Sequence, residues 1–92
     1  MENNTFAKHP TFYAVGLSYK KADAEMRGKF SLDEQAKTNL LNQAKAEGID
    51  NLIVTSTCNR TEIYGFAQHP FQLIKLLCEN SQGTVEDFQK VA

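Results

Sequence analysis

The chain has 92 residues, of which 41% are hydrophobic and 23% are charged, and its formal net charge is −1. This size suits one small domain, and the near-neutral charge gives no overall basic excess of the kind that marks nucleic-acid-binding proteins. No apolar run approaches the roughly 20 residues of a membrane-spanning helix, and the first residues lack the layout of a signal peptide, so we expect a cytoplasmic protein without a membrane partner.

The first third of the chain predicts a tail, a strand and a loop. We expect residues 1–10, which are mostly polar, to be a flexible N-terminal tail. Residues 11–19 are rich in strand-forming side chains and predict the first strand, in which Gly16 indicates a bulge or a close backbone approach. Residues 20–30 mix basic and acidic side chains and predict a solvated loop.

The middle of the chain predicts a helix followed by two strands. Ser31 and Glu34 have the spacing of a capping box at the start of a helix, and Gly48 is a natural residue to end it. Residues 49–58 predict the second strand, with alternate side chains facing opposite ways. Residues 61–67 predict the third strand, so we expect a turn between the two.

The last part of the chain predicts two more helices. Pro70 suits the first turn of one helix, and Thr84 is a cap for the other. The resulting order β-α-β-β-α-α predicts an α+β fold of the split β-α-β type, a sandwich with helices on one face of a small sheet. That arrangement usually has one more strand, so we expect that a final strand is missing and that the chain is a piece of a longer protein.

The two cysteines stand in different surroundings. Cys78 lies on the apolar side of a predicted helix, where we expect it to pack in the core. Cys58 follows a strand, and in an extended backbone Arg60 would stand on the same side, beside the sulfur. A neighbouring cation favours a reactive thiolate, and the planar fork of arginine matches a carboxylate. This pair predicts a nucleophile next to a carboxylate-binding group, which suits an acyl substrate.

The same stretch also allows a purely structural interpretation. Thr57 and Asn59 can shape a turn, while Arg60 and Glu62 can form a surface ion pair. The two histidines are expected to be solvated rather than to act as general bases. The spacing of the cysteines and histidines matches no compact zinc site, so we expect no metal.

The stretch STCNRTEIY, residues 56–64, resembles the most distinctive motif of the glutamyl-tRNA reductase family. Residues 15–30 resemble the opening strand and loop of that family, with matches at Gly16, Lys20, Ala22 and Arg27. The chain departs from the family pattern at Tyr19, Lys21, Asp23 and Gly28, where His, Thr, Pro and Glu are usual. These departures weigh against a substrate role for the loop, in which Lys20 and Arg27 remain candidates for substrate or packing contacts.

The resemblance implies the thiol-bearing catalytic domain of an oxidoreductase in porphyrin (tetrapyrrole and haem) biosynthesis, which reduces glutamyl-tRNA to glutamate-1-semialdehyde through a cysteine thioester. By resemblance, Cys58 is the catalytic nucleophile and Arg60 binds the carboxylate of the substrate. Thr57 and Asn59 would line the glutamate pocket, and Glu62 would shape the site by pairing with a nearby cation.

The resemblance also implies a cofactor and partners bound outside this chain. Family members use NADPH on a separate Rossmann domain and form homodimers through a C-terminal domain, so we interpret residues 11–92 as a partial N-terminal catalytic (glutamate-recognition) domain that does not perform the reduction alone. The implied partners are glutamyl-tRNA and glutamate-1-semialdehyde aminotransferase, and no metal is implied. The alternative is a non-catalytic α+β domain that binds tRNA or a protein.

Overall fold

The computed structural model describes residues 10–91 as a three-stranded antiparallel sheet and four helices. In chain order, the elements are β1 (Thr11–Ser18), α1 (Ala24–Lys29), α2 (Glu34–Ala46), β2 (Ile53–Ser56), β3 (Arg60–Ala67), α3 (Pro70–Glu79) and α4 (Val85–Val91). The sheet has the order β1-β3-β2. The predicted α+β class and the order β-α-β-β-α-α are therefore confirmed, with a short helix α1 added in the segment that was wrongly predicted to be only a loop. Apart from Pro10, the predicted tail lies outside the described residues.

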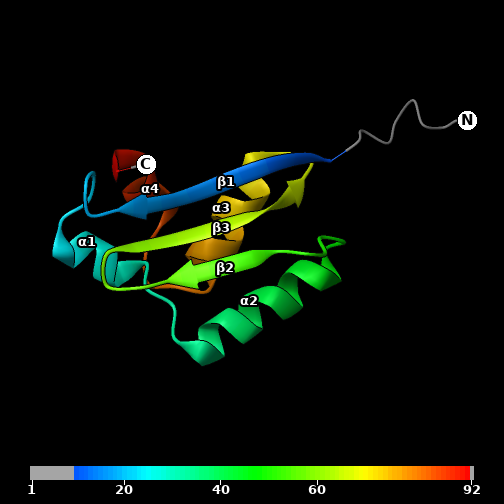
Figure 1. Ribbon diagram of the computed structural model, residues 1–92, viewed down its shortest axis with the longest axis horizontal. Coiled ribbons are helices and arrows are strands. Elements are labelled where there is room, and N and C mark those ends of the chain that lie inside the picture. Colours follow the sequence, from blue (N-terminus) through cyan, green and yellow to red (C-terminus); the bar gives the residue numbers. More distant parts are fainter. Residues whose placement is uncertain (1–9, 92) are drawn as a thin grey trace, which may run out of the picture.

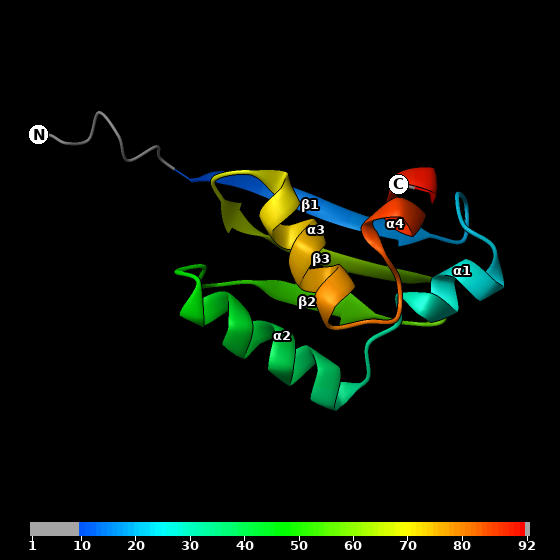
Figure 2. The same ribbon diagram turned by 180° about the vertical axis from the view of Figure 1, so that it is seen from behind.

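Helix α3 packs across one face of the sheet. In Figure 1 helix α3 crosses behind the strands, and in Figure 2, seen from the opposite side, it crosses in front of them while α2 runs beside β2. A core of buried side chains fills the space between these layers, and its fully buried members are Phe30, Leu40, Ile63, Leu73, Leu76 and Leu77. The helices of the described part of the chain are all too short or too polar to cross a membrane.

Strand alternation leaves the other face of the sheet uncovered. On β3, the side chains of Thr61 and Ile63 are buried toward the helices. Phe66 alternates with them and lies opposite Phe12 of β1, and the two rings meet edge to face with centroids 5.3 Å apart. Both phenylalanines are about half exposed. The same alternation places three polar side chains of β3 on the uncovered face, namely Arg60, Glu62 and Tyr64.

The pairing of β1 with β3 decides between the two explanations for Gly16. The register runs without interruption from the pair Thr11–Ala67 to the pair Ser18–Arg60, so there is no bulge. Gly16 pairs with Glu62, and a Cβ atom at Gly16 would clash with the carbonyl oxygen of Thr61. The predicted close approach of the backbone is therefore the correct explanation.

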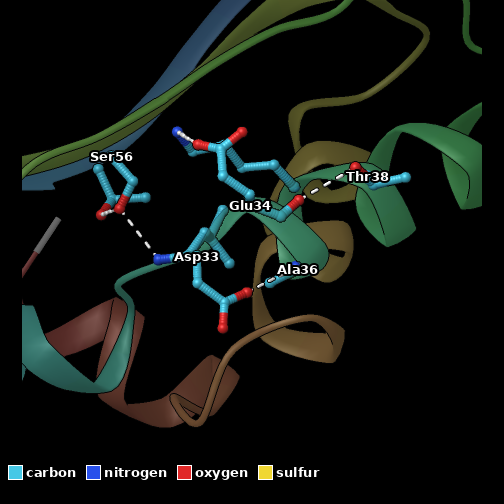
Figure 3. Close-up of polar contacts among 8 residues, drawn as sticks. Asp33, Glu34, Ala36, Thr38 and Ser56 are labelled. Carbon is cyan, nitrogen blue, oxygen red and sulfur yellow. Dashed lines mark hydrogen bonds and ion pairs between the residues drawn. The ribbon is translucent and has the colours of Figure 1, made fainter.

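The start of α2 differs from the sequence prediction. The carboxylate of Asp33 accepts a hydrogen bond of 2.8 Å from the backbone N–H of Ala36, so Asp33 and not Ser31 is the N-cap (Figure 3). The side chain of Leu32 is buried and its N–H donates to Ser56 Oγ at 3.0 Å, which prevents the helix from starting earlier. At the other end, Gly48 follows the helix with a φ of 84°, a left-handed conformation that suits glycine.

Candidate active site

Cys58 lies in the turn between β2 and β3, at the end of the sheet near α1 (Figure 1). The strand pairing ends at Ser56 and Thr61, and the N–H of Thr57 then donates to the carbonyl oxygen of Arg60 at 2.8 Å. All four residues of the turn 57–60 are exposed. The prediction of a turn at this position is confirmed, and the thiol of Cys58 is accessible from solvent.

Thr57 stabilises the turn through its hydroxyl group. Thr57 Oγ1 accepts hydrogen bonds from the N–H groups of Asn59 at 3.2 Å and of Arg60 at 3.3 Å. Threonine commonly satisfies backbone N–H groups in turns in this way. Thr57 therefore shapes the turn, as one interpretation of the sequence predicted.

Two partly buried hydroxyl contacts hold the base of the turn. Ser56 Oγ and Thr61 Oγ1 lie 3.0 Å apart, and Ser56 Oγ also accepts the hydrogen bond from Leu32 N–H (Figure 3). Thr61 is only 1% exposed. Since buried polar groups are costly to leave without partners, these contacts fix the strand ends that carry Cys58 relative to the segment before α2.

The segment between β1 and α2 holds the turn from the other side. The N–H of Tyr19 donates to the carbonyl oxygen of Asn59 at 2.8 Å. Arg27 of α1 donates from Nε to the carbonyl oxygen of Cys58 at 3.1 Å and from Nη1 to that of Ala22 at 2.8 Å. Sequence analysis missed the contact of Arg27 with Cys58, because no local pattern links residues that are 31 positions apart.

The side chains of Arg60, Glu62 and Tyr64 form a chain of contacts on the uncovered face of β3. Arg60 Nη1 lies 3.6 Å from Glu62 Oε2, and the hydroxyl of Tyr64 donates to Glu62 Oε1 at 2.5 Å. This hydrogen bond raises the pKa of Tyr64; partial desolvation and the charge of Glu62 add to the increase, while Arg60 opposes it. The carboxylate of Glu62 thus joins a cation near the turn to a phenol further along the strand.

We expected Arg60 to stand beside the sulfur of Cys58 because we assumed an extended backbone from Cys58 to Arg60. That assumption was wrong. Cys58 and Asn59 form a bend in which the chain reverses direction, so strand alternation does not relate Cys58 to Arg60. Within the described residues, the guanidinium group of Arg60 pairs with Glu62, and the thiol of Cys58 contacts Asn59 Oδ1 at 3.9 Å.

A shallow hollow of about 220 Å³ lies on the uncovered face next to this cluster. Gly16 forms part of its floor because it has no side chain, and the polar groups around it include Ser18, Lys21, Glu62 and Tyr64. The hollow therefore offers one ammonium group, one carboxylate and two hydroxyls within a small volume. It lies on the same face of β3 as Arg60.

Cys78 and His69 do not join Cys58. Cys78 packs against the core as predicted; burial raises the pKa of its thiol, and Asp87 and Glu79 add to the increase. His69 caps α3, with Nδ1 accepting from the N–H of Phe71 at 3.0 Å. The eight residues of β3, roughly 25 Å of strand, separate it from the turn.

His9, the other histidine, lies outside the described residues. Within residues 10–91, no three His, Cys, Asp or Glu side chains gather in a way that could hold a metal ion.

Comparison with known proteins identifies similar chains. Residues 15–92 match the family model described as Glutamyl-tRNAGlu reductase, N-terminal domain. Over all 92 residues, the chain is 84% identical to a glutamyl-tRNA reductase of Flavobacterium psychrophilum and 70% identical to one of Christiangramia forsetii. It is 36% identical over 70 residues to a glutamyl-tRNA reductase of Acinetobacter baumannii. The chain spans 22% of the length of each of the first two relatives and 16% of the third.

Proposed function

Because the chain belongs to the glutamyl-tRNA reductase family, we propose that it supplies the thiol nucleophile and the glutamate-binding groups for the reduction of glutamyl-tRNA in tetrapyrrole biosynthesis. One observation carries the proposal: Cys58 is exposed in a turn whose backbone is held by Thr57 on one side and by Arg27 on the other. A nucleophile needs both access to the substrate and a fixed direction of attack, and this turn provides both.

In the proposed reaction, the ionised sulfur of Cys58 attacks the carbonyl carbon of the ester that joins glutamate to the tRNA. A carbon–sulfur bond forms and the carbon–oxygen bond to the ribose breaks. The ribose oxygen leaves as a free hydroxyl group, and the proton it takes up balances the proton that the thiol released. The product of this step is a thioester between glutamate and Cys58.

Arg60 is the proposed partner for the side-chain carboxylate of the glutamyl group. Its side chain is 47% exposed, and the 3.6 Å contact of its guanidinium group with Glu62 is longer than a strong hydrogen bond, so an incoming carboxylate can replace Glu62 as its partner. In this proposal Thr57 and Asn59 form the wall of the glutamate pocket next to the sulfur. Glu62, itself held by Tyr64, keeps Arg60 on the uncovered face.

The residues of this chain do not fit an NADPH site. The sequence contains no G-x-G-x-x-G run, and none of the helices in residues 10–91 follows a glycine-rich turn of the dinucleotide-binding type. The proposal therefore places NADPH binding and dimerisation in the larger part of the relatives' length that this chain does not span. The whole protein would then be a cytoplasmic homodimer whose aldehyde product passes to glutamate-1-semialdehyde aminotransferase.

The first test is to look for the thioester directly. We expect that mixing the chain with glutamyl-tRNA adds one glutamyl group to the peptide that contains Cys58, and that hydroxylamine removes it. Digestion and mass spectrometry locate the adduct. The adduct should be absent from Cys58→Ala, which has no sulfur to form it.

Cys78→Ala is the matched control, since it removes the other thiol and keeps the nucleophile. It should give the same adduct as the unsubstituted chain. A glutamyl adduct that persists in Cys58→Ala at an equal level would disprove the assignment. Binding of glutamyl-tRNA without any adduct would favour the alternative of a non-catalytic binding domain.

A further inference from the structure

The peptide group that joins Cys58 to Asn59 is held by side chains at both of its polar ends. Its carbonyl oxygen accepts the hydrogen bond of 3.1 Å from Arg27 Nε. Its N–H, which belongs to Asn59, donates to Thr57 Oγ1 at 3.2 Å. The strand ladder contributes to neither contact, so the orientation of this peptide depends on two side chains.

Peptides in this position of a turn can adopt two orientations. In a four-residue turn such as 57–60, the common types I and II differ mainly in which way the central peptide points. The flipped form needs a positive φ at the third residue, here Asn59, and asparagine tolerates positive φ better than most residues. Within residues 10–91 the only non-glycine residue with a positive φ is Asn51, so Asn59 does not have the φ that the flipped form needs. The sequence of the turn permits the flip, and the contact from Arg27, outside the turn, opposes it.

Arg27 can oppose the flip of the Cys58–Asn59 peptide because its own side chain is held in place. Its Nη1 donates to the carbonyl oxygen of Ala22 at 2.8 Å, and Ala22 is buried in the core. Its backbone N–H bonds to the carbonyl oxygen of Asp23 at the start of α1. A side chain that is already ordered by one bond loses little further freedom when it makes a second.

We propose that Arg27 is a positioning residue for Cys58. By holding the carbonyl oxygen of Cys58, it fixes the Cys58–Asn59 peptide and with it the direction from which the sulfur meets the ester. The effect of Arg27 on the attack by the sulfur rests on the proposed function, whereas the fixing of the Cys58–Asn59 peptide by Arg27 does not. Because Arg60 is left in place, loss of Arg27 should slow the attack more than it weakens substrate binding.

The kinetic test compares Arg27→Gln, Arg27→Lys and Lys29→Gln in single-turnover thioester formation at increasing glutamyl-tRNA concentrations. We expect Arg27→Gln to lower the limiting rate about 10- to 100-fold, the scale expected when reacting groups are misplaced, with a less than about twofold change in the half-saturating concentration. Arg27→Lys should recover part of the rate, because lysine can reach one carbonyl oxygen but lacks the fork that bonds two. Lys29→Gln also removes one positive charge from α1. The contact it loses is the 3.7 Å ion pair with Asp87, which does not involve the turn, so its rate should equal that of the unsubstituted chain.

The structural test measures the residual dipolar coupling of the Asn59 N–H by NMR. Arg27→Gln should change this coupling while the couplings of β1 and β3 stay the same, which also shows that the variant is folded. An unchanged Asn59 coupling together with an unchanged limiting rate in Arg27→Gln would overturn the proposal, as would an equal loss of rate in Lys29→Gln. If even the unsubstituted chain forms no thioester, the proposed function fails, and the NMR comparison alone decides whether Arg27 fixes this peptide.

Discussion

At the scale of single residues, Glu62 connects the turn to the face of the sheet. Each of its two carboxylate oxygens has a different partner, Arg60 on the side of the turn and the hydroxyl of Tyr64 on the other. Its partner in β1 is Gly16, which has no side chain to fill the hollow. A carboxylate held in this way keeps a cation near the turn and a phenol further along the strand at fixed places.

The first prediction concerns the pKa of Tyr64. In Glu62→Gln we expect this pKa to fall toward the ordinary tyrosine value near 10, because both the hydrogen bond to the carboxylate and its negative charge favour the neutral phenol. A titration of phenolate absorbance against pH measures the change, and subtraction of the Tyr64→Phe titration isolates the signal. Glu34→Gln, which removes a carboxylate on α2, is the control and should leave the titration unchanged. Equal titration curves for Glu62→Gln and the unsubstituted chain would contradict the contact.

At the scale of elements, the N-terminus of α2 shows how tertiary contacts choose between local signals. The sequence offers two good caps, Ser31 and Asp33, two residues apart. Ser31 Oγ donates to the carbonyl oxygen of Gly28 instead of accepting from a helix N–H, while Asp33 accepts from Ala36. The choice follows from the burial of Leu32 between them, because a residue anchored in the core fixes where the chain can begin to coil.

The second prediction compares these two caps. Asp33→Ala should lower the free energy of unfolding by about 1 kcal/mol, the typical cost of losing an N-cap that also carries a favourable charge. Ser31→Ala should cost clearly less, since it removes a single exposed hydrogen bond. Urea unfolding followed by circular dichroism measures both variants. A larger loss in Ser31→Ala than in Asp33→Ala would show that the helix begins earlier than in the structure.

At the scale of the whole molecule, Phe30 links the support of the turn to the last helix. Its side chain is fully buried, and its ring meets that of Phe88 in α4 edge to face with centroids 5.9 Å apart. Gly83 lies so close that a Cβ atom there would overlap the ring of Phe30. The N–H of Gln82 also donates to the carbonyl oxygen of Lys29 at 2.8 Å. The connection between α3 and α4 thus packs against the end of α1, the helix that carries Arg27.

The third prediction follows from this packing. Phe30→Ala should lower the free energy of unfolding by about 3–5 kcal/mol, since it removes a buried ring and leaves a cavity. Gly83→Ala should also destabilise the fold, because its methyl group overlaps the Phe30 ring. Gly28→Ala is the matched control: it lies in α1 with open space around it, so it should leave stability unchanged or raise it by up to about 1 kcal/mol. Chemical unfolding curves test all three, and a stability loss in Gly28→Ala as large as that in Gly83→Ala would contradict the packing.

The sequence by itself determined the number and order of strands, the three longer helices, the turn at Cys58 and the packing of Cys78 against the core. These features depend on hydrophobic periodicity and turn residues within a few positions of one another, so they can be predicted without knowing what the rest of the chain does.

Tertiary structure alone decided which residue caps α2, which face of α3 is buried and what surrounds Cys58. On α3, Leu73, Leu76 and Leu77 are buried whereas Phe71 is 44% exposed, because the sheet covers only one side of a helix that is apolar on several sides. Likewise, the cation that contacts the Cys58 backbone is Arg27 and not its near neighbour Arg60. Such contacts join residues that are distant in the sequence, and only the folded chain brings them together.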